Sequence, residues 1–226
     1  MVQYNAGQDI HPDQVNDHGA IIGALGIYEN GGKRSLDILL IVLALPFLLP
    51  LMVLVALAIM VDGNSPIYTQ NRLGRGWQAF RLYKFRTMKP DADQLLQAHL
   101  ASDPAAREEW NRDQKLRHDP RVTRVGAFLR RTSLDELPQL FNVLLGHMSL
   151  VGPRPMMPEQ RVLYPGVYYA VHRPGLTGLW QVSVRNGCTF AGRAMYDERY
   201  SREVSLSLDV ATIVQTFRVV ARCTGC

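Results

Sequence analysis

The hydrophobic positions of this chain are concentrated in one run near its start. Residues 38–61 are 24 consecutive uncharged, apolar positions, interrupted only by Pro46 and Pro50. A straight helix needs about 20 residues to cross the hydrocarbon core of a bilayer, so the run is long enough. Its aliphatic and aromatic side chains favour insertion by roughly 5–10 kcal/mol before any cost of the prolines. The run therefore predicts a helix inside a membrane.

The prolines and the flanking charges favour a helix that enters the membrane and returns to the side from which it came. Each proline removes a helical N–H, and lipid offers no replacement partner for the backbone groups that are freed. Basic residues stand on both sides of the run: Lys33, Arg34, Arg72, Arg75 and Arg81. Because such residues tend to stay in the cytoplasm, we expect a re-entrant helix–break–helix over 33–62. A proline-kinked single span is the alternative.

The remaining segments divide the chain further. Residues 1–32 are mostly polar with little periodicity, which predicts a loosely ordered tail. A cleaved signal peptide fits poorly, because the run is longer than an h-region and lacks a following cleavage site. Residues 63–226 are long enough for one cytosolic domain with a real core. No transmembrane bundle precedes the run in this sequence.

Within the cytosolic part, the pattern predicts mostly helices. Residues 65–70 and 80–85 read as a β-hairpin around a turn at 71–76. Residues 91–117 have helical spacing with a break at Pro104. A short basic helix is expected over 122–131, and the segment 132–138 opens another that runs to about Leu145.

The last third of the chain is less regular. Segments 151–155 and 173–178 are expected to be neither helix nor central strand because of their Pro and Gly content. Helical spacing returns over 197–220. The expected fold class is mainly α with a small β-hairpin (α+β), with the re-entrant helix packed on the cytosolic domain.

Composition narrows the chemistry only in part. The net charge is +5 and the sequence pI is about 9.3, which suits nucleic acid, anionic lipid or a nucleotide-diphosphate substrate. The three cysteines, Cys188, Cys223 and Cys226, do not form a disulfide framework. The six histidines show no ligand spacing, so a transition-metal site is not predicted.

The adjacent carboxylates Asp135 and Glu136 are the first candidate for chemistry. One interpretation is a capping box, since Ser133 and Glu136 have the required spacing. The other places Pro138 at the first helical position, which leaves both carboxylates just before the helix. Arg130, immediately upstream with its neighbour at 131, would keep such a carboxylate ionised as a nucleophile or metal ligand.

Basic residues in two loops form the second candidate. Lys84 and Arg86 lie in the string FRLYKFRTM, and Arg154 stands between two prolines that restrict its backbone. These cations suit phosphate oxygens, but a solvated or lipid-facing patch explains them equally well. Asp197 lies in a helical region, where a lone acid is more often a surface charge or cap.

Several long strings, taken in order, resemble one family. KRSLDILL (33–40), YKFRTM (83–88), DPRVTRVGAFLRRTSLDELPQLFNVLLGHMSLVGPRP (119–155) and RPGLTGLWQV (173–182) resemble the bacterial sugar transferases, the monotopic phosphoglycosyl transferases that start exopolysaccharide and glycoconjugate assembly. The chain is similar to the minimal form of the family, and its apolar run resembles the family's re-entrant hairpin, with Pro50 at the matching break. The segment EEWNRDQKLRHDP is similar to members that use UDP-glucose or UDP-galactose.

The resemblance implies a reaction and roles for the candidate residues. A hexose 1-phosphate would pass from a UDP-hexose to polyprenyl (undecaprenyl) phosphate, with UMP released and a covalent phosphosugar–aspartate between the two steps. Asp135 matches the nucleophile and Glu136 the residue that helps hold Mg²⁺. Substrate-binding roles fall to the remaining candidates: Lys84, Arg86, Arg130, Arg131, Arg154 and Asp197.

The resemblance also implies surroundings and partners. The chain would lie on the cytoplasmic face of the bacterial inner membrane, in contact with lipids, with no nucleic-acid partner and with a homodimer as a possible assembly. Two readings from other classes stay open. One is a membrane-tethered nucleic-acid-binding protein that uses the basic helix at 121–131, although an acidic pair there would repel phosphates. The other is a catalytically silent scaffold.

Overall fold

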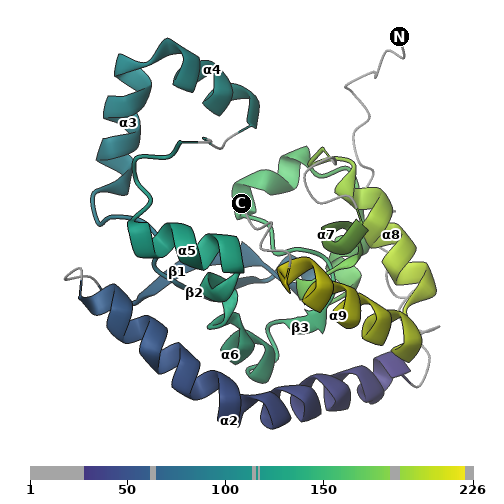
Figure 1. Cartoon of the computed structure of the whole chain (residues 1–226). Helices are drawn as coiled ribbons and strands as arrows, with labels where there is room; N and C mark the ends of the chain where they lie inside the picture. Colours follow the sequence, from purple (N-terminus) through teal and green to yellow (C-terminus); the bar gives the residue numbers. More distant parts are fainter. Residues whose placement is uncertain (1–27, 62–64, 114–115, 117, 184–188, 222–226) are drawn as a thin grey trace.

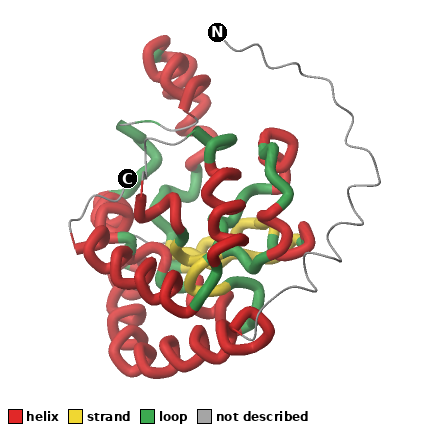
Figure 2. The backbone as a smooth tube through the Cα atoms, turned by 90° about the vertical axis from the view of Figure 1, so that its right-hand side faces the viewer, coloured by secondary structure: helices red, strands yellow, loops and turns green. Residues whose placement is uncertain are grey.

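The computed structural model has helices arranged around two small sheets. It describes residues 28–61, 65–113, 116, 118–183 and 189–221. Figure 2 shows the strands at the centre of the molecule with helices on the sides around them. The expected α+β class, mainly helical with a small hairpin, is confirmed.

The apolar run forms one continuous helix. Helix α2 spans Lys33–Met60 and contains both Pro46 and Pro50. It bends along the lower edge of the molecule (Figure 1). The break expected at Pro50 is therefore wrong in detail: each proline costs one hydrogen bond and kinks the backbone, while the turns on either side stay helical.

Both halves of α2 pack on the same domain. Ile41 belongs to a core cluster with Leu82 of the hairpin and Val143 of helix α6 (Gln139–Leu144). Met52, Val55 and Ile59 join a second cluster that includes Phe85 and Leu129. The helix thus follows the domain from its first turns to its last ones. It does not leave the domain at either end.

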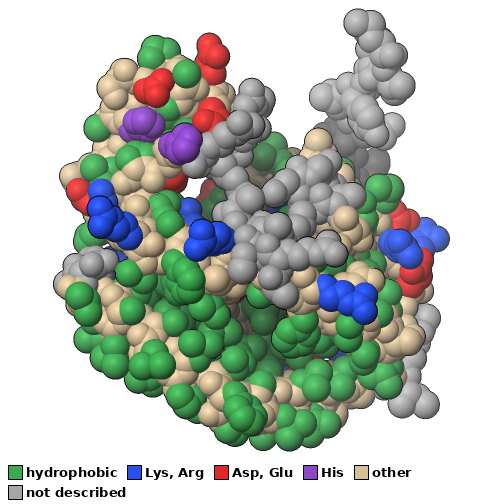
Figure 3. Space-filling model, in the orientation of Figure 1, with side chains coloured by type: hydrophobic (Ala, Val, Ile, Leu, Met, Phe, Trp, Pro, Cys, Tyr) green, Lys and Arg blue, Asp and Glu red, His purple; other side chains and the backbone are tan. Residues whose placement is uncertain are grey.

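The opposite face of α2 is apolar and uncovered. Phe47 is 79% exposed, and Leu43 and Leu54 are also mostly exposed. Hydrophobic side chains gather along this lower edge in the space-filling view (Figure 3). Among the described residues, α2 is the one helix long and apolar enough to cross a membrane by length and composition. Its two faces therefore suit the domain on one side and lipid on the other.

The segment just before α2 is held against the domain. Tyr28–Gly32 form a helical turn, and the Tyr28 hydroxyl donates to Asp209 Oδ2 at 2.7 Å. These residues were expected in the loosely ordered tail, whose remainder, 1–27, lies outside the described residues. All three cysteines also lie outside them. The periodicity of 28–32 gave no sign of this contact, because its partner is far along the chain.

The hairpin forms where the alternation predicted it. Strands β1 (Ile67–Leu73) and β2 (Ala79–Phe85) are antiparallel, and Ile67 lies opposite Phe85. The strands extend further toward the turn than expected, and the turn itself is a 3-10 segment at Arg75–Trp77. Gly76 there has φ 64°, a left-handed conformation that suits glycine.

The next helices also follow the predicted pattern. Helix α3 (Ala92–Ser102) and helix α4 (Pro104–Asp113) form a pair that projects from the molecule, and Pro104 begins the second of them as expected (Figure 1). Helix α5 (Arg124–Thr132) follows. At its first turn Gly126 touches the chain leaving β2: a Cβ here would lie 2.0 Å from the Thr87 carbonyl oxygen.

The irregular segments of the last third contain a short sheet. Strands β3 (Ser149–Val151) and β4 (Gly175–Thr177) pair in parallel. We expected 151–155 and 173–178 to be neither helix nor central strand, and that interpretation misses this pairing. A two-stranded sheet has no central strand, and the prolines stand just outside the paired residues.

Three helices complete the fold. They are α7 (Leu179–Ser183), α8 (Arg193–Glu203) and α9 (Leu206–Ala221). The helical region expected over 197–220 is thus two helices. Two further 3-10 segments, Pro158–Leu163 and Tyr168–Val171, lie in the connection between β3 and β4.

Asn142 provides a test of the packing between α6 and β2. It is fully buried; the Tyr83 N–H donates to its Oδ1 (2.9 Å), and its Nδ2 donates to the Arg81 carbonyl (2.6 Å). We expect Asn142→Ala to lower the free energy of unfolding by about 2–4 kcal/mol, because two buried backbone groups lose their partners. Thermal unfolding in detergent measures this effect. The exposed Asn71→Ala on β1 is the control, and equal losses in both variants would contradict the assignment.

Candidate active site

A short 3-10 turn carries the two adjacent carboxylates. Leu134–Glu136 lies between α5 and α6, and Ser133 before it ends α5 in a left-handed conformation (φ 59°, ψ 17°). The Ser133 side chain makes no capping hydrogen bond, so the capping-box interpretation is wrong. Pro138 is the N-cap of α6, one position before the expected one. Both carboxylates stand ahead of the helix, as the second interpretation predicted. A non-glycine residue with positive φ stores strain, which is common at functional sites.

Lys84 of β2 faces both acids. Its Nζ donates to Glu136 Oε1 at 2.9 Å and lies 3.9 Å from Asp135 Oδ2. On the other side, an Arg154 guanidinium nitrogen is 3.6 Å from the same Glu136 oxygen. The structure thus brings together four predicted site residues from three segments of the chain. Lys84 therefore lies near both acids, and Arg154 lies near Glu136.

A pocket opens beside this group. Three cations line it, Arg72, Lys84 and Arg154, together with Glu136 and the buried amide Gln139. Asp135 lies at its border through its approach to Lys84. Three cations around one carboxylate leave the pocket with positive charge. Such a pocket suits a ligand with several negative oxygens.

The two carboxylates differ in their electrostatics. Burial raises the pKa of Asp135, and it outweighs the favourable charge of Lys84. Burial opposes ionisation of Glu136 too, but Lys84 and Arg154 bring its pKa down to about 2. Glu136 is therefore firmly ionised, whereas Asp135 is a more basic, poorly solvated carboxylate. We expected the arginines to keep such a carboxylate ionised at neutral pH; the charges of Arg130 and Arg154 do favour ionisation of Asp135, and its burial acts against them.

Arg154 lies beside an aromatic ring as well. Its guanidinium is 5.8 Å from the centre of the Trp180 ring of α7, and that of Arg193 is 4.4 Å from it. Trp180 itself is buried, and its ring nitrogen has no hydrogen-bond partner among the described residues. The prolines on either side of Arg154 and this ring limit the directions in which the guanidinium can point.

The other predicted arginines are placed differently. Arg130 is half-buried; its Nε donates to Thr87 Oγ1 at 3.0 Å, and its charge favours ionisation of Asp135. Arg86 is half-buried with an Nε that has no hydrogen-bond partner in the described structure. Arg131 is exposed on the last turn of α5. Neither Arg86 nor Arg131 lines the pocket.

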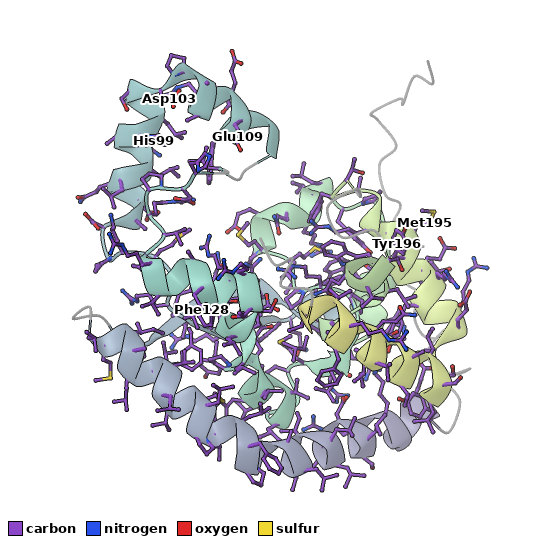
Figure 4. The ribbon with its side chains drawn as sticks, in the orientation of Figure 1. His99, Asp103, Glu109, Phe128, Met195 and Tyr196 are labelled. Atoms are coloured by element: carbon purple, nitrogen blue, oxygen red, sulfur yellow. The ribbon has the colours of Figure 1, made fainter. Side chains whose placement is uncertain are left out.

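Asp197 belongs to a separate cluster. It is buried on α8, and the Tyr164 hydroxyl donates to its Oδ2 at 2.6 Å. Tyr164 packs on Trp77 and Tyr169, so aromatic rings surround the pair. Tyr196, beside Asp197, lies on the side of the molecule away from α3 and α4 (Figure 4). Among the described residues, no hydrogen bond or ion pair joins Asp197 to Asp135 or Glu136.

The carboxylate oxygens of this site fit a hard cation such as Mg²⁺, which substrate phosphates would also help to hold. Among the described residues, no group of three or more His, Cys, Asp and Glu side chains is close enough to hold a metal by itself. Mg²⁺ is commonly bound by one or two carboxylates together with substrate phosphates and water. Adjacent Asp135 and Glu136 at a cationic pocket supply those oxygens, so the residues fit.

Two residues with polar side chains that line the pocket, Arg72 and Gln139, were not predicted as site residues. Arg72 donates to Gln70 Oε1 at 2.6 Å, and burial together with Arg154 lowers its pKa. Gln139 follows the carboxylate turn and is buried. From the sequence, Arg72 was identified only as a basic residue that flanks the apolar run. The hairpin register could have indicated it. Arg72 lies opposite Phe80, and Phe80 and Lys84 are on the same face of β2, so Arg72 and Lys84 share that face of the hairpin.

Comparison with known proteins decides the family. A family model described as bacterial sugar transferase matches residues 28–223, most of the chain. The chain belongs to the bacterial sugar transferase family. The resemblance seen in the sequence is thereby confirmed.

Individual relatives are similar over most of this chain. The exopolysaccharide production protein ExoY of Sinorhizobium fredii is 46% identical over 90% of this chain and 91% of its own length. An uncharacterized sugar transferase of Haemophilus influenzae is 46% identical over 83% of this chain. The undecaprenyl-phosphate galactose phosphotransferase of Salmonella typhimurium is 45% identical over 85%. The chain spans only about two fifths of these last two proteins, 40% and 41%.

The buried Asp197 predicts a distinctive pH dependence of stability. Burial raises its pKa to about 7, whereas an unfolded aspartate titrates near 3.9. Between these values the folded state keeps a proton that the unfolded state has lost, so this carboxyl destabilises the fold as pH rises from about 4 to 7.

Asp197→Asn still accepts a hydrogen bond from Tyr164, so we expect its free energy of unfolding to match that of the wild type near pH 4. At pH 8 its free energy of unfolding should be higher than that of the wild type by up to about 4 kcal/mol. Thermal unfolding between pH 4 and 8 measures the difference. An exposed control is Asp93→Asn on α3. Parallel profiles for wild type and Asp197→Asn would contradict the raised pKa.

Proposed function

We propose that the protein transfers a hexose 1-phosphate from a UDP-hexose of the glucose or galactose type to polyprenyl phosphate, and so initiates exopolysaccharide or glycoconjugate assembly. The observation that carries the proposal is the carboxylate pair at the cationic pocket. A desolvated Asp135 stands beside an ionised Glu136, and Lys84 contacts both. The printed name of the Salmonella relative, a galactose phosphotransferase acting on undecaprenyl phosphate, supports this substrate class.

The first step uses Asp135 as the nucleophile. A carboxylate oxygen attacks the β-phosphorus, which carries the sugar, and the bond from that phosphorus to the oxygen bridging the α-phosphate breaks. UMP leaves with the bonding electrons. Burial supports this role, because a poorly solvated carboxylate loses less hydration on attack. Lys84, Arg72 and Arg154 would bind the diphosphate oxygens and offset the charge that develops on them.

The second step regenerates the enzyme. A phosphate oxygen of polyprenyl phosphate attacks the same phosphorus, the bond to Asp135 breaks, and the aspartate leaves as a carboxylate. The products are polyprenyl diphosphate hexose and the starting protein. Glu136, with the substrate phosphates, would hold Mg²⁺, which supplies Lewis-acid neutralisation of phosphoryl charge when bound. Glu136 suits that role because it stays ionised.

The lipid substrate requires a membrane position. We propose that α2 is re-entrant, lies in the cytoplasmic leaflet of the inner membrane and keeps the domain on the cytoplasmic face. The packing of both halves of α2 on one domain supports this topology. A helix that crosses the bilayer would carry one end away from the domain. The uncovered apolar face of α2 would then meet lipid tails.

A nucleic-acid-binding role has less support. That reading relied on the basic helix at 121–131 for phosphate contacts. Arg121 is buried, and its guanidinium is bound by both oxygens of Asp119, at 2.8 and 2.7 Å. Arg130 is bonded to Thr87. Two of the cations that the reading needs are thus already engaged inside the protein.

The nucleophile assignment predicts a covalent adduct. Protein incubated with Mg²⁺ and a panel of UDP-hexoses, without polyprenyl phosphate, should gain the mass of one hexose phosphate on Asp135, as seen by mass spectrometry. Asp135→Asn should abolish the adduct and lower UMP release by at least about a thousandfold. The exposed Asp93→Asn should leave both unchanged. UMP release that survives in Asp135→Asn would reject the assignment.

The membrane position predicts where the chain ends lie. Tags at the N-terminus and the C-terminus should both stay unlabelled when intact spheroplasts are treated with an impermeant reagent. Both should be labelled after lysis, which serves as the control for accessibility. One tag labelled from outside would show that α2 crosses the bilayer.

A further inference from the structure

A second polar pocket lies at the start of α2, apart from the carboxylate turn. Its walls include Lys33 and Arg34 from the first turn of α2, Arg75 from the hairpin turn, and Arg173 from the segment before β4. Two acids, Glu29 and Asp37, also line it. The start of α2 lies beside the first turn of α9 (Figure 1), and none of these residues lines the pocket at Glu136.

The two acids of this pocket differ in their partners. Asp37 accepts from the Ser149 hydroxyl (2.7 Å) and from the Leu150 N–H (3.1 Å). Glu29 lies 3.5 Å from His172 Nδ1. Burial lowers the pKa of His172 to about 4, with help from the cations nearby, so this histidine is neutral. Asp37 is thus bound by the protein, whereas Glu29 Oε1 is buried with no hydrogen-bond partner among the described residues, and the charges of Lys33 and Arg75 favour ionisation of Glu29. The four cations of the pocket still outnumber its two acids.

The cations keep hydrogen-bond donors to spare. Arg173 uses its Nε on the Gly146 carbonyl at 2.8 Å, and Arg34 contacts the carbonyls of Val143 and Leu144. Arg75 is exposed, and its side chain makes no hydrogen bond or ion pair within the described residues. Burial lowers the pKa of Arg173, and Arg75 and Arg34 lower it further. Three guanidinium groups thus repel one another, and an anion among them would relieve that repulsion.

The position of the pocket indicates the source of that anion. The turns of α2 that follow the pocket expose apolar side chains, beginning with Leu39 (56% exposed) and Leu43 (62%). The pocket therefore stands at the boundary between the apolar helix and the polar domain, where the phosphates of a bilayer lie. We propose that this pocket binds the phosphate of a membrane phospholipid through Arg34, Arg75 and Arg173. The proposal requires α2 to meet lipid, but it does not depend on the transfer reaction.

Arg75 offers the cleanest test, because it is exposed and its side chain makes no hydrogen bond or ion pair within the described residues. The full chain, purified in detergent, is titrated with dioleoyl phosphatidylglycerol, and bound lipid is counted by native mass spectrometry. Dioleoylglycerol, which has the same tails and no phosphate, is the matched probe. We expect the wild type to retain one phospholipid and no dioleoylglycerol. Arg75→Ala should weaken retention about tenfold, whereas Arg75→Lys should keep most of it.

Arg124→Ala is the matched protein control, since Arg124 is exposed on α5 outside the pocket. It should bind phospholipid as the wild type does. Added inorganic phosphate separates the two sources of the anion. If millimolar phosphate fails to displace the lipid, the pocket selects headgroups; if it displaces the lipid only when Arg75 is present, the pocket also accepts free phosphate. Equal retention by the wild type and Arg75→Ala, or equal retention of both lipids, would overturn the proposal.

Discussion

The rest of the structure depends on the contact between α2 and the domain above it. The residues that meet α2 come from β2, α5 and α6, the same elements that carry or flank the carboxylate turn. Burying a large aliphatic side chain stabilises a fold by about 1.5–3 kcal/mol, and several contribute here. The membrane helix and the candidate active site therefore share one core. A lipid-borne substrate would meet the carboxylates at a depth fixed by this packing.

Charge is distributed around the carboxylates in a way that shifts their pKa values in opposite directions. Lys84 contacts both, yet Glu136 also has Arg154 nearby, and Asp135 is affected mainly by burial. Neighbouring acids with different environments commonly take different tasks in one reaction. The strained conformation of Ser133 aims the turn so that both side chains reach β2.

Local patterns predicted most elements and half of the candidate site. The alternation around 65–85, the break at Pro104 and the position of Pro138 all carry information within a few residues, and the structure agrees with them closely. The remainder depends on contacts across the chain. The pairing of β3 with β4 involves three residues on each strand, too few for a periodic signal. Arg72 reaches the pocket only through the strand register, and the raised pKa of Asp135 arises from burial, which no local pattern reveals.

The projecting pair of helices α3 and α4 has its own small cluster, with Leu96, Leu100 and Ala106 at its centre. It joins the body at the bridge between Met88 and Val122 and through Arg121, whose guanidinium lies 5.1 Å from the centre of the Trp110 ring of α4. A unit with a separate core can open with little effect on the rest of the molecule. Changes within α3 and α4 should therefore disturb the body less than changes in the core that α2 shares with the carboxylate turn.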